Sequence, residues 1–307
     1  MTSIFEKKII KSLEELGIIG INEPLSNHTS FKTGGPADIL IIPRNSGSLK
    51  EIIDIADKND FPVTVVGGCS NLLVGDSGIR GLVVKIGDNG ENRGKIKIDD
   101  DVVYADSSVK KGRFINCCLE NGFEGMEFMS GIHGCIGGGI IMNAGIAEAV
   151  FADILDSIDY MDMKGNTGTM KITEDMAGYR SLGIDRNIIV LGGYFRLKRT
   201  DDAEKVKIKI DRYIAERKIK HPLDRPSAGS VFKNPPGYSS WKLIDEAGLK
   251  GKMIGGAQVS ELHTNFIINA GGASSLDIRC LIDHVKEIVL SKTGVLLEAE
   301  IKMLGEF

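Results

Sequence analysis

Two clusters of glycine constrain the fold of this chain more than any other feature of its sequence. The first, Gly67-Gly68-Cys69-Ser70-Asn71, follows a predicted strand, and the second runs from Gly131 to Gly145 into an apolar segment. Closely spaced glycines let backbone N–H groups approach an anion without interference from a Cβ atom, so such loops can hold a pyrophosphate. The alternative interpretation is tight turns in a glycine-rich sheet protein.

The usual nucleotide-binding signatures are missing from both clusters. No stretch gives a complete GxGxxG after a strand, and no GxxxxGK(S/T) occurs. Ser70, Asn71 and Asn143 stand beside the glycines and could add side-chain hydrogen bonds. Together the two clusters favour a bound dinucleotide, held by a route other than the Rossmann fold.

Length and charge restrict the classes of protein to which the chain can belong. Its 307 residues exceed what one hydrophobic core usually supports, so two or three packed units are expected. The formal net charge of -4 gives no sign of a nucleic-acid or anionic-membrane surface. A local basic pocket for phosphates stays compatible with that charge.

Neither the cysteines nor the histidines are spaced as metal ligands. The number of cysteines, five, is odd, no CxxC occurs, and the scattered histidines form no HExxH. Reduced thiols in a cytosolic protein without a metal site are therefore the expectation.

The beginning of the chain predicts a helix and not a targeting segment. Ile9, Ile10, Leu13 and Leu16 recur at helical intervals, and lysines interrupt the segment. No apolar run in the chain approaches the roughly 18 residues of a membrane span. We therefore expect a cytoplasmic protein without a signal peptide or membrane anchor.

Hydrophobic periodicity predicts an α+β chain with a domain boundary near His221-Pro222. A charged helical pattern breaks there, and the loop that follows contains three prolines, so a larger N-terminal and a smaller C-terminal portion are expected. The segment 164–168 predicts a hairpin turn. Strands are predicted at 37–42, 62–66, 81–86, 102–105, 154–163, 266–268 and 295–303, and helices at 48–58, 111–120, 201–220, 240–247 and 275–291, the last ended by Gly294.

Three further segments carry side chains suited to chemistry. The run 227–235 holds Ser230, Lys233 and Asn234 between glycine and proline, although a plain polar loop is an equal alternative. In the run 295–301 the strand period places Glu298 and Glu300 on one face, where carboxylates are usually solvated but one could act in a cleft. Tyr179-Arg180 is either a surface pair or a clamp for an anion.

These segments together resemble the MurB family of UDP-N-acetylenolpyruvoylglucosamine reductases, in family order and across nearly the whole chain. Residues 67–74 are similar to the family's GGGSNLLV. The matching segments are 27–29, 33–35, 67–74, 125–128, 131–145, 178–181, 228–235, 254–260, 263–269 and 297–301.

The resemblance implies a fold and a division into domains. It implies an FAD-binding domain of the vanillyl-alcohol-oxidase (PCMH) type over 1–200, built of two α+β subdomains at about 1–66 and 67–200. A substrate-binding α+β domain follows over 201–307, and its last strand contributes Glu300 to the active site. Only about fifty residues separate Arg180 from Ser230, so the chain resembles the shorter, type II members.

The resemblance also implies an activity. NADPH reduces the bound FAD, and flavin N5 then delivers hydride to C3 of the enolpyruvyl group, which yields UDP-N-acetylmuramate for peptidoglycan synthesis. Arg180 and Glu300 match the family's groups beside the substrate carboxylate, where donors to a developing negative charge are often worth about 3 to 4 kcal/mol each. Glu300 could help only if it is protonated or bridged by water. Ser230 matches the proton donor to C2.

The remaining site residues follow from the same resemblance. Lys233, Asn234 and His263 are expected to bind substrate, and the protein is expected to be a monomer without nucleic-acid or membrane partners. The expected flavin-binding residues are Thr33, Gly67, Gly68, Cys69, Ser70, Asn71, Ser130, Gly131, Gly134, Cys135, Gly137, Gly138, Asn143, Ala144 and Gly145.

Some positions around the expected flavin site depart from the family pattern. His133 stands where proline is usual, Cys69 where glycine is common, and Cys135 where serine or threonine is common, and 146–149 differs from the usual continuation. Two rival interpretations are a flavin oxidase of the same fold and a flavin or nucleotide-sugar binding protein that has lost catalysis. Neither needs the intact set of Arg180, Ser230 and Glu300.

Overall fold

The computed structural model describes residues 4–87, 94–185 and 187–307, which form two compact units. The expected functional division at 200/201 follows the order of the chain, whereas both units are assembled from separate segments. Unit 1 consists of Met1–Ile21, Ile39–Gly68 and Gly81–Ala215, and unit 2 of Asn22–Asp38, Cys69–Arg80 and Glu216–Phe307.

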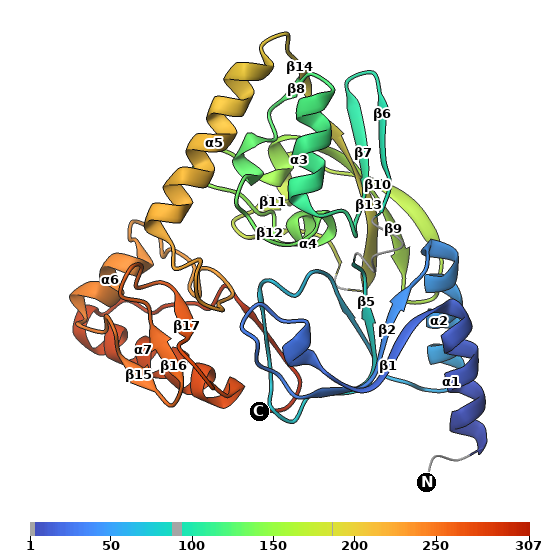
Figure 1. Ribbon diagram of the computed structural model, residues 1–307, viewed down its shortest axis with the longest axis horizontal. Coiled ribbons are helices and arrows are strands. Elements are labelled where there is room, and N and C mark those ends of the chain that lie inside the picture. Colours follow the sequence, from blue (N-terminus) through green and yellow to red (C-terminus); the bar gives the residue numbers. More distant parts are fainter. Residues whose placement is uncertain (1–3, 88–93, 186) are drawn as a thin grey trace. The chain divides into compact units, whose positions relative to one another are not determined.

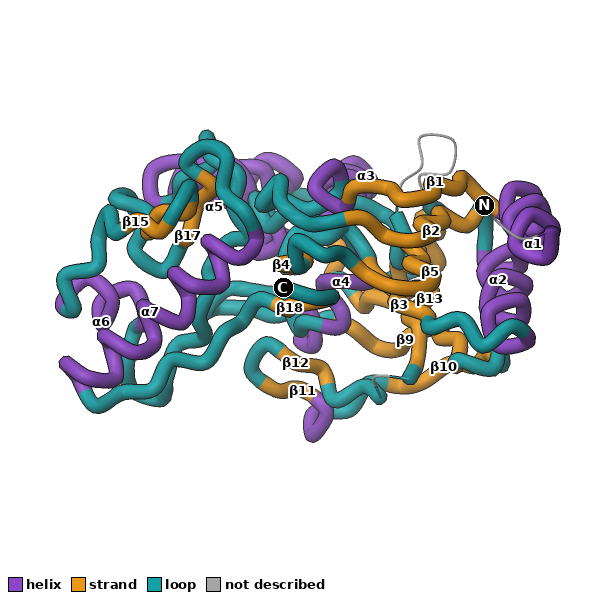
Figure 2. Tube along the Cα trace, turned by 90° about the horizontal axis from the view of Figure 1, so that it is seen from below, coloured by secondary structure: helices purple, strands orange, loops and turns teal. Residues whose placement is uncertain are grey.

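A four-stranded sheet, most of it in unit 1, is accompanied by two helices, α1 (Ile4–Leu16) and α2 (Ser46–Lys58). The two helices lie side by side in both views (Figures 1 and 2). Helix α2 forms where the sequence predicts it, because four apolar residues at helical spacing are buried and the Asn45 side chain accepts a hydrogen bond from Ser48 N at 3.0 Å. The strand order is β1 (Gly17–Pro24), β2 (Pro36–Pro43), β5 (Ile79–Lys85) and β3 (Val63–Val66), with β3 and β5 parallel.

The second sheet of unit 1 has five antiparallel strands and packs against α3 (Lys111–Glu120) and α4 (Ile136–Ile141). The rings of Phe114, Phe151 and Phe195 are fully buried in this core, and the Phe195 centroid lies 4.9 Å from that of Phe114 and 5.9 Å from that of Phe151. The strand order is β10 (Thr167–Lys171), β9 (Leu155–Asp162), β13 (Ile188–Arg196), β7 (Val102–Asp106) and β6 (Ile96–Asp99).

Smaller elements complete unit 1. Two short antiparallel pairs are β8 (Phe123–Glu124) with β14 (Lys198–Arg199), and β11 (Ala177–Gly178) with β12 (Ser181–Leu182). Helix α5 (Ala203–Lys220) runs across the boundary between the two units. The 3-10 turns of the chain are η1 (Leu25–Asn27), η2 (Glu127–Met129), η3 (Phe151–Asp153) and η4 (Glu174–Met176).

Unit 2 has its own apolar core, built on α6 (Ser240–Glu246) and α7 (Ser275–Thr293). Helix α7 starts with a capping box of Ser274 and Asp277 and ends at Gly294, whose φ of 72° is left-handed as a helix C-terminus favours. The strands are β15 (Met253–Ile254), β16 (Ala257–Val259) and β17 (Ile267–Asn269) in one antiparallel sheet, and β4 (Leu72–Val74) parallel to β18 (Lys302–Leu304).

The structure confirms the six predicted helices, the one at the beginning of the chain included, and the hairpin at 164–168, where Asp162 N donates to Asn166 O at 2.9 Å. The predicted strand at 295–303 is wrong, because only Lys302–Leu304 joins a strand ladder. The apolar alternation before it reflects an extended segment that buries Leu297 and Ile301 and forms an isolated bridge, Phe232 to Ala299, without a continuous ladder. In the described part of the chain, no helix is long and apolar enough to span a bilayer.

Candidate functional site

The two glycine clusters approach each other within unit 1. A Cβ atom on Gly68 would lie 3.2 Å from Gly134 Cα and 3.3 Å from Cys135 N, and one on Gly67 would lie 4.0 Å from Gly138 N. Glycine therefore permits the backbone of the first cluster to lie directly against that of the second. By contrast, no heavy atom lies within 4 Å of the position of a Cβ atom on Gly138. The paired loops form a cradle of backbone atoms with open space on the Gly138 side.

Two of the predicted flavin-binding residues carry buried hydroxyl groups that make no hydrogen bond within the described part of the chain. These atoms are Thr33 Oγ1 and Ser130 Oγ, and Ser275 Oγ, outside the predicted site, is a third such hydroxyl. Buried polar atoms are almost always hydrogen-bonded in folded proteins, so the Thr33 and Ser130 hydroxyls indicate an additional group in the functional state. The residues present therefore fit a bound polar cofactor.

Backbone strain occurs at three of the predicted site residues. Seven non-glycine residues of the described chain have a positive φ, and three of them belong to the predicted site: Cys69 (52°), Asn143 (38°) and Arg180 (57°). The left-handed region is unfavourable for residues with a Cβ, and strained residues cluster at active sites and ligand clamps. At Cys69 the strain occurs where the resembled family commonly has glycine.

Arg180 occupies the turn of a short hairpin. Strands β11 and β12 pair Gly178 with Ser181, so Tyr179 and Arg180 are the two residues between them. The Arg180 guanidinium carbon lies 5.3 Å from the centroid of the Tyr179 ring. The amide of Asn143 tethers this hairpin, because its Nδ2 donates to Gly178 O at 3.0 Å while its Oδ1 accepts from Ala152 N at 2.9 Å. Asn143 thus links the end of the second glycine cluster to the loop that carries Arg180.

Ser230 and Glu300 come together in unit 2 through their backbones. The segment 230–233 lies between two others, since Ser230 bridges Phe266 and Glu300 N donates to Val231 O at 2.7 Å. The buried amide of Asn265 clasps the same segment, accepting from Phe232 N at 2.9 Å and donating to Phe232 O at 2.8 Å. These contacts place a serine hydroxyl and a carboxyl on neighbouring extended segments.

The first glycine cluster continues into this part of unit 2. Asn71 Nδ2 donates to Glu300 O at 3.3 Å, and Lys302 N donates to Asn71 O at 2.9 Å. The predicted flavin-binding residue Asn71 therefore contacts the backbone of the predicted catalytic residue Glu300. On the other side of the cluster, Ser30 N donates to Cys69 O at 3.3 Å.

The side chains of Glu298 and Glu300 have different surroundings. Glu298 is exposed and its Oε1 lies 2.5 Å from Lys233 Nζ, whose hydrogen bond lowers the pKa of the Glu298 carboxyl. Glu300 is half-buried. The expectation that strand pairing puts both on one face has no basis, because 295–301 is not a strand. Lys233, a predicted substrate-binding residue, has an ion-pair partner in Glu298.

His263, also predicted to bind substrate, belongs to an aromatic cluster in unit 2. Its ring centroid lies 5.4 Å from that of His221 and 5.0 Å from that of Phe266. Burial lowers the pKa of His263, and burial followed by the nearby Arg217 lowers the pKa of His221 to about 4. Both rings are therefore neutral near pH 7.

The predicted site residues are distributed over the two units. Unit 1 contains Gly67, Gly68, Ser130, Gly131, Gly134, Cys135, Gly137, Gly138, Asn143, Ala144, Gly145 and Arg180, and unit 2 contains Thr33, Cys69, Ser70, Asn71, Ser230, Lys233, Asn234, His263 and Glu300. The sequence analysis did not predict that the side-chain amides of Asn143 and Asn265 hold neighbouring loops, or that Lys111 is buried beside the second cluster. The signal that could have indicated these roles is a polar residue within an otherwise apolar pattern.

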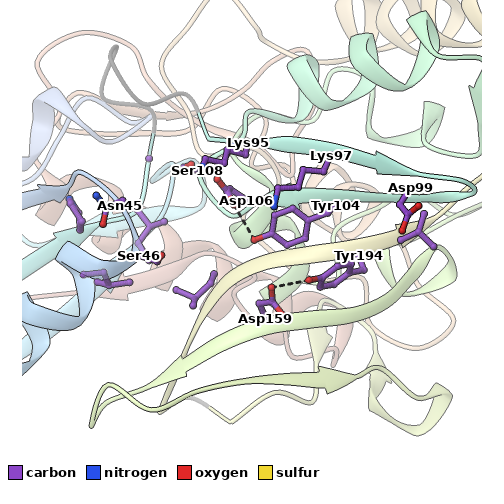
Figure 3. Close-up of a pocket in the computed structure, with 16 residues that line it drawn as sticks. Asn45, Ser46, Lys95, Lys97, Asp99, Tyr104, Asp106, Ser108, Asp159 and Tyr194 are labelled. Carbon is purple, nitrogen blue, oxygen red and sulfur yellow. Dashed lines mark hydrogen bonds between the residues drawn. The ribbon is translucent and has the colours of Figure 1, made fainter.

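A cavity of about 580 Å³ in unit 1 is lined by none of these residues. Two tyrosine–aspartate pairs project into it, Tyr104 donating to Asp106 at 3.0 Å and Tyr194 to Asp159 at 3.1 Å (Figure 3). Burial, and then the neighbouring Asp106, raises the pKa of Tyr104. The hydroxyl groups of Tyr104 and Tyr194 have partners within the cavity, whereas the unsatisfied hydroxyls of Thr33 and Ser130 belong to predicted flavin-binding residues. The cradle is therefore a better candidate for the flavin site than the cavity is.

The described residues contain no group of three or more His, Cys, Asp or Glu side chains arranged to hold a metal ion, and none of the five cysteines, all of them described, is in a disulfide bond.

Comparison with known proteins assigns a family model to each of the two parts of the chain. Residues 221–304 match the family model of the C-terminal domain of UDP-N-acetylenolpyruvoylglucosamine reductase, and residues 37–171 match that of an FAD binding domain. These matches, together with the mixed helices and sheets, confirm the expected α+β fold with an FAD-binding domain and a C-terminal domain.

Relatives that match the chain over nearly its full length carry the same name as the C-terminal family model. A UDP-N-acetylenolpyruvoylglucosamine reductase of Caldanaerobacter subterraneus is 39% identical over 307 residues, 100% of both chains. One of Clostridium tetani is 41% identical over 297 residues, 96% of this chain and 95% of that one. The crystal structure of the same reductase from Thermus caldophilus has a TM-score of 0.78 and 29% identity, covering 94% of this chain and 98% of that one.

Proposed function

The chain belongs to the MurB family of UDP-N-acetylenolpyruvoylglucosamine reductases, and we propose that it reduces this enolpyruvyl sugar to UDP-N-acetylmuramate. In this role it is an FAD-dependent oxidoreductase of peptidoglycan precursor synthesis with NADPH as co-substrate. The observation that carries the proposal is the backbone arrangement in unit 2 that brings Ser230 beside the Glu300 segment. The reduction adds a hydride to C3 and a proton to C2, so the protein needs a proton donor beside C2 and a group that stabilises the negative charge growing there.

The glycine cradle is the proposed holder of the FAD pyrophosphate. Gly68, Gly134 and Gly138 have no Cβ atom to keep an anion from their backbone N–H groups, and the unsatisfied Ser130 hydroxyl adds a donor in the same unit. When bound, FAD supplies the hydride that reaches C3 of the enolpyruvyl group. The protein supplies position and electrostatics.

Arg180 and Glu300 act on the substrate carboxylate in this proposal. Negative charge grows through C2 into that carboxylate as C3 receives hydride, so a guanidinium placed there stabilises the transition state more than the ground state. The left-handed turn and the Asn143 tether hold Arg180 in position before substrate binds. A positioned donor needs no reorganisation during the reaction, which is the source of its catalytic effect.

Ser230 is the proposed proton donor to C2. A serine hydroxyl is a weak acid in water, so it must protonate a carbon that already carries developed negative charge. Its place is fixed by the bridge to Phe266 and by the Asn265 amide, which holds Phe232 two residues further along the same segment. Lys233, Asn234 and His263 are the proposed substrate-binding residues around it, and we also propose a cytoplasmic monomer.

The test separates the two half-reactions by rapid mixing without oxygen. In Ser230→Ala, reduction of the flavin by NADPH should match wild type, whereas its reoxidation by the enolpyruvyl sugar should slow at least about a hundredfold. Ser227→Ala, three residues away in the same loop, is the control and should leave both rates unchanged. Wild-type reoxidation rates in Ser230→Ala would remove the serine from the proposal. Fast reoxidation of the wild type by oxygen alone would indicate an oxidase instead.

A further inference from the structure

Helix α5 exposes apolar residues on the side opposite to the one that it buries. It is one continuous helix (Figure 1), and it buries Val206 and Ile210 in the core of the five-stranded sheet. Ile208 and Ile219, by contrast, are 61% and 73% exposed, which makes them two of the three most exposed large apolar side chains among the described residues. Scattered apolar residues are common on protein surfaces, so what matters is whether these two share one face of the helix.

The two isoleucines lie on one line of the helix together with Arg212 and Ala215, and all four residues are exposed. The four positions are separated by four, three and four residues, which is the spacing of the a and d positions in a coiled coil. At 3.6 residues per turn they fall within about 60° of one another, opposite to the buried side. This line, the α5 seam, is narrower than the apolar face with which a helix packs on a core or lies in a membrane surface.

A second copy of α5 in antiparallel orientation fits the seam. In such a pair each a residue faces a d residue of the other helix, so Ile208 lies opposite the partner's Ile219 and Arg212 opposite the partner's Ala215. Two isoleucines fill one layer, and the small alanine leaves room for the long arginine side chain. A twofold axis repeats both layers, so the contacts form a closed, self-complementary set.

The charges beside the seam favour the antiparallel orientation. Asp211 and Lys218 flank the seam on the same side, and each faces the other's counterpart when the helices are antiparallel. Neither makes an ion pair within the part of the chain that the structure describes. In a parallel pair Arg212 would face the partner's Arg212, and Asp211 would face the partner's Glu216, so both contacts would be repulsive.

We propose that the α5 seam is a site of self-association, at which two copies of the chain pair through antiparallel α5 helices. The seam is about 16 Å long, and so short an interface buries less surface than the roughly 1,200 Å² of stable complexes. The pairing is therefore weak, with a dissociation constant on the order of 100 µM, and dilute protein remains the proposed monomer. None of the predicted site residues lies on α5, so the pairing is separate from catalysis.

Sedimentation equilibrium of the purified protein, from about 10 µM to about 1 mM, measures this association. The average mass of wild type should rise from that of one chain toward that of two. Lys218→Glu sets two acidic residues against each other and should raise the dissociation constant at least about tenfold. Lys207→Glu is the matched control, because it makes the same change of charge at an exposed lysine of α5 away from the seam, and it should change the constant by less than about twofold.

Exchanging the two flanking charges gives the most specific readout. Asp211→Lys alone should weaken the association as Lys218→Glu does, since each leaves like charges face to face. The double variant Asp211→Lys/Lys218→Glu should return to within about threefold of wild type, a rescue that a loss of folding cannot produce. Raised salt should weaken the pairing of wild type and of the double variant alike.

Wild-type protein that keeps the mass of one chain at the highest concentration would overturn the proposal. Equal weakening by Lys218→Glu and Lys207→Glu, or a double variant without rescue, would overturn it as well. Monomeric wild type that sediments with phosphatidylglycerol vesicles would assign the seam to an anionic bilayer and not to a second copy.

Discussion

Gly137 and Gly138 are neighbours in the short helix α4 but have opposite surroundings. A Cβ atom on Gly137 would lie 2.7 Å from Ser107 Cβ, whereas none of the neighbouring atoms comes within 4 Å of one on Gly138. The first glycine is therefore required by packing inside unit 1. The second is required by nothing in the protein alone, which is the behaviour expected of a position that faces a bound group.

The pair gives a matched prediction. Gly137→Ala should lower the free energy of unfolding by about 1 to 3 kcal/mol, because a well-packed neighbour must move. Gly138→Ala should leave the stability of the apoprotein unchanged or slightly raised, since alanine is the better helix former. It should nevertheless weaken FAD binding, because its methyl group enters the cradle. Chemical denaturation and a flavin titration measure the two effects, and tight FAD binding by Gly138→Ala would place the cofactor elsewhere.

Asn143 shows what the sequence could and could not predict about a single residue. The sequence singled it out as a flavin-binding residue, but its amide hydrogen-bonds Gly178 O and Ala152 N. A sequence pattern can single out an asparagine beside glycines, but it cannot indicate a hydrogen-bond partner such as Gly178, 35 residues away. The resemblance identified Arg180, Ser230 and Glu300 from short matching segments. The tethers that hold them are visible only in three dimensions.

Replacing Asn143 by alanine should affect both the fold and the reaction. Two buried hydrogen bonds are lost and a Cβ-bearing residue without the tolerance of asparagine is left at a φ of 38°, so a loss of about 2 to 4 kcal/mol of stability is expected. The freed hairpin should misplace Arg180 and lower kcat more than it raises KM. Gly178 cannot serve as control, but Ser181→Ala in the same hairpin can. Wild-type kcat in a folded Asn143→Ala enzyme would refute the tether.

At the scale of elements, capping by a distant side chain decides where α7 begins. Both carboxylate oxygens of Asp76 accept hydrogen bonds at 2.8 Å, from Ser275 N and Leu276 N in the first turn of the helix. Asp277 N also donates to the Ser274 hydroxyl at 3.0 Å, a capping contact that the sequence pattern alone could suggest. The Asp76 contact joins residues about 200 positions apart in the chain. It connects the loop after β4 to α7 within unit 2.

Asp76→Ala should therefore destabilise unit 2 by about 1 to 2 kcal/mol, the usual effect of losing a helix cap. Glu287→Ala, which removes an exposed carboxylate from the same helix, is the control and should change stability by less than about 0.5 kcal/mol. Thermal and denaturant unfolding curves measure both. Equal stability of Asp76→Ala and wild type would mean that the Ser274 capping box alone suffices.

Elements with strong internal periodicity were predictable, and those defined by distant partners were not. Helices α2, α3 and α7 could be predicted from the regular spacing of their apolar residues and from the residues that begin or end them. The segment 295–301 alternates like a strand but finds no continuous partner, so it stays extended without a ladder. Strand pairing depends on a neighbour that periodicity does not reveal.

At the scale of the whole molecule, the division into units shows the same limit. The sequence predicted a boundary near His221-Pro222 from the end of a charged helical pattern, and the last segment of unit 2 begins at Glu216, inside α5. The sequence did not predict that residues 22–38 and 69–80 belong to the same unit as the C-terminal segment. One of the contacts that join them, the parallel pairing of β4 with β18, links residues about 230 positions apart. Non-local contacts of this kind leave no periodic trace in a single sequence.

The neutral histidines make the stability of the molecule depend on pH. The pKa of His221 is about 4 in the folded protein but near 6.5 in the unfolded chain, so the unfolded chain binds more protons between these values. The free energy of unfolding should therefore fall by about 1 to 2 kcal/mol from pH 7 to pH 5. In this window the carboxyls with lowered pKa, such as Asp277 and Glu298, remain ionised in the folded protein.

His221→Gln should flatten this pH dependence, and His284→Gln, which removes a histidine outside the cluster, should keep it. Urea unfolding at pH 7, 6 and 5 gives the slopes directly. A His221→Gln variant with the wild-type slope would show that His221 is not the group responsible.

The central claim is that one bound FAD passes reducing equivalents from NADPH to an enolpyruvyl sugar, and an anaerobic titration of the visible spectrum tests it most directly. Purified protein should show the bands of bound flavin, one equivalent of NADPH should bleach them, and one equivalent of UDP-N-acetylenolpyruvoylglucosamine should then restore them without oxygen. A protein that takes up no flavin, or a reduced flavin that the enolpyruvyl sugar does not reoxidise, would contradict the claim.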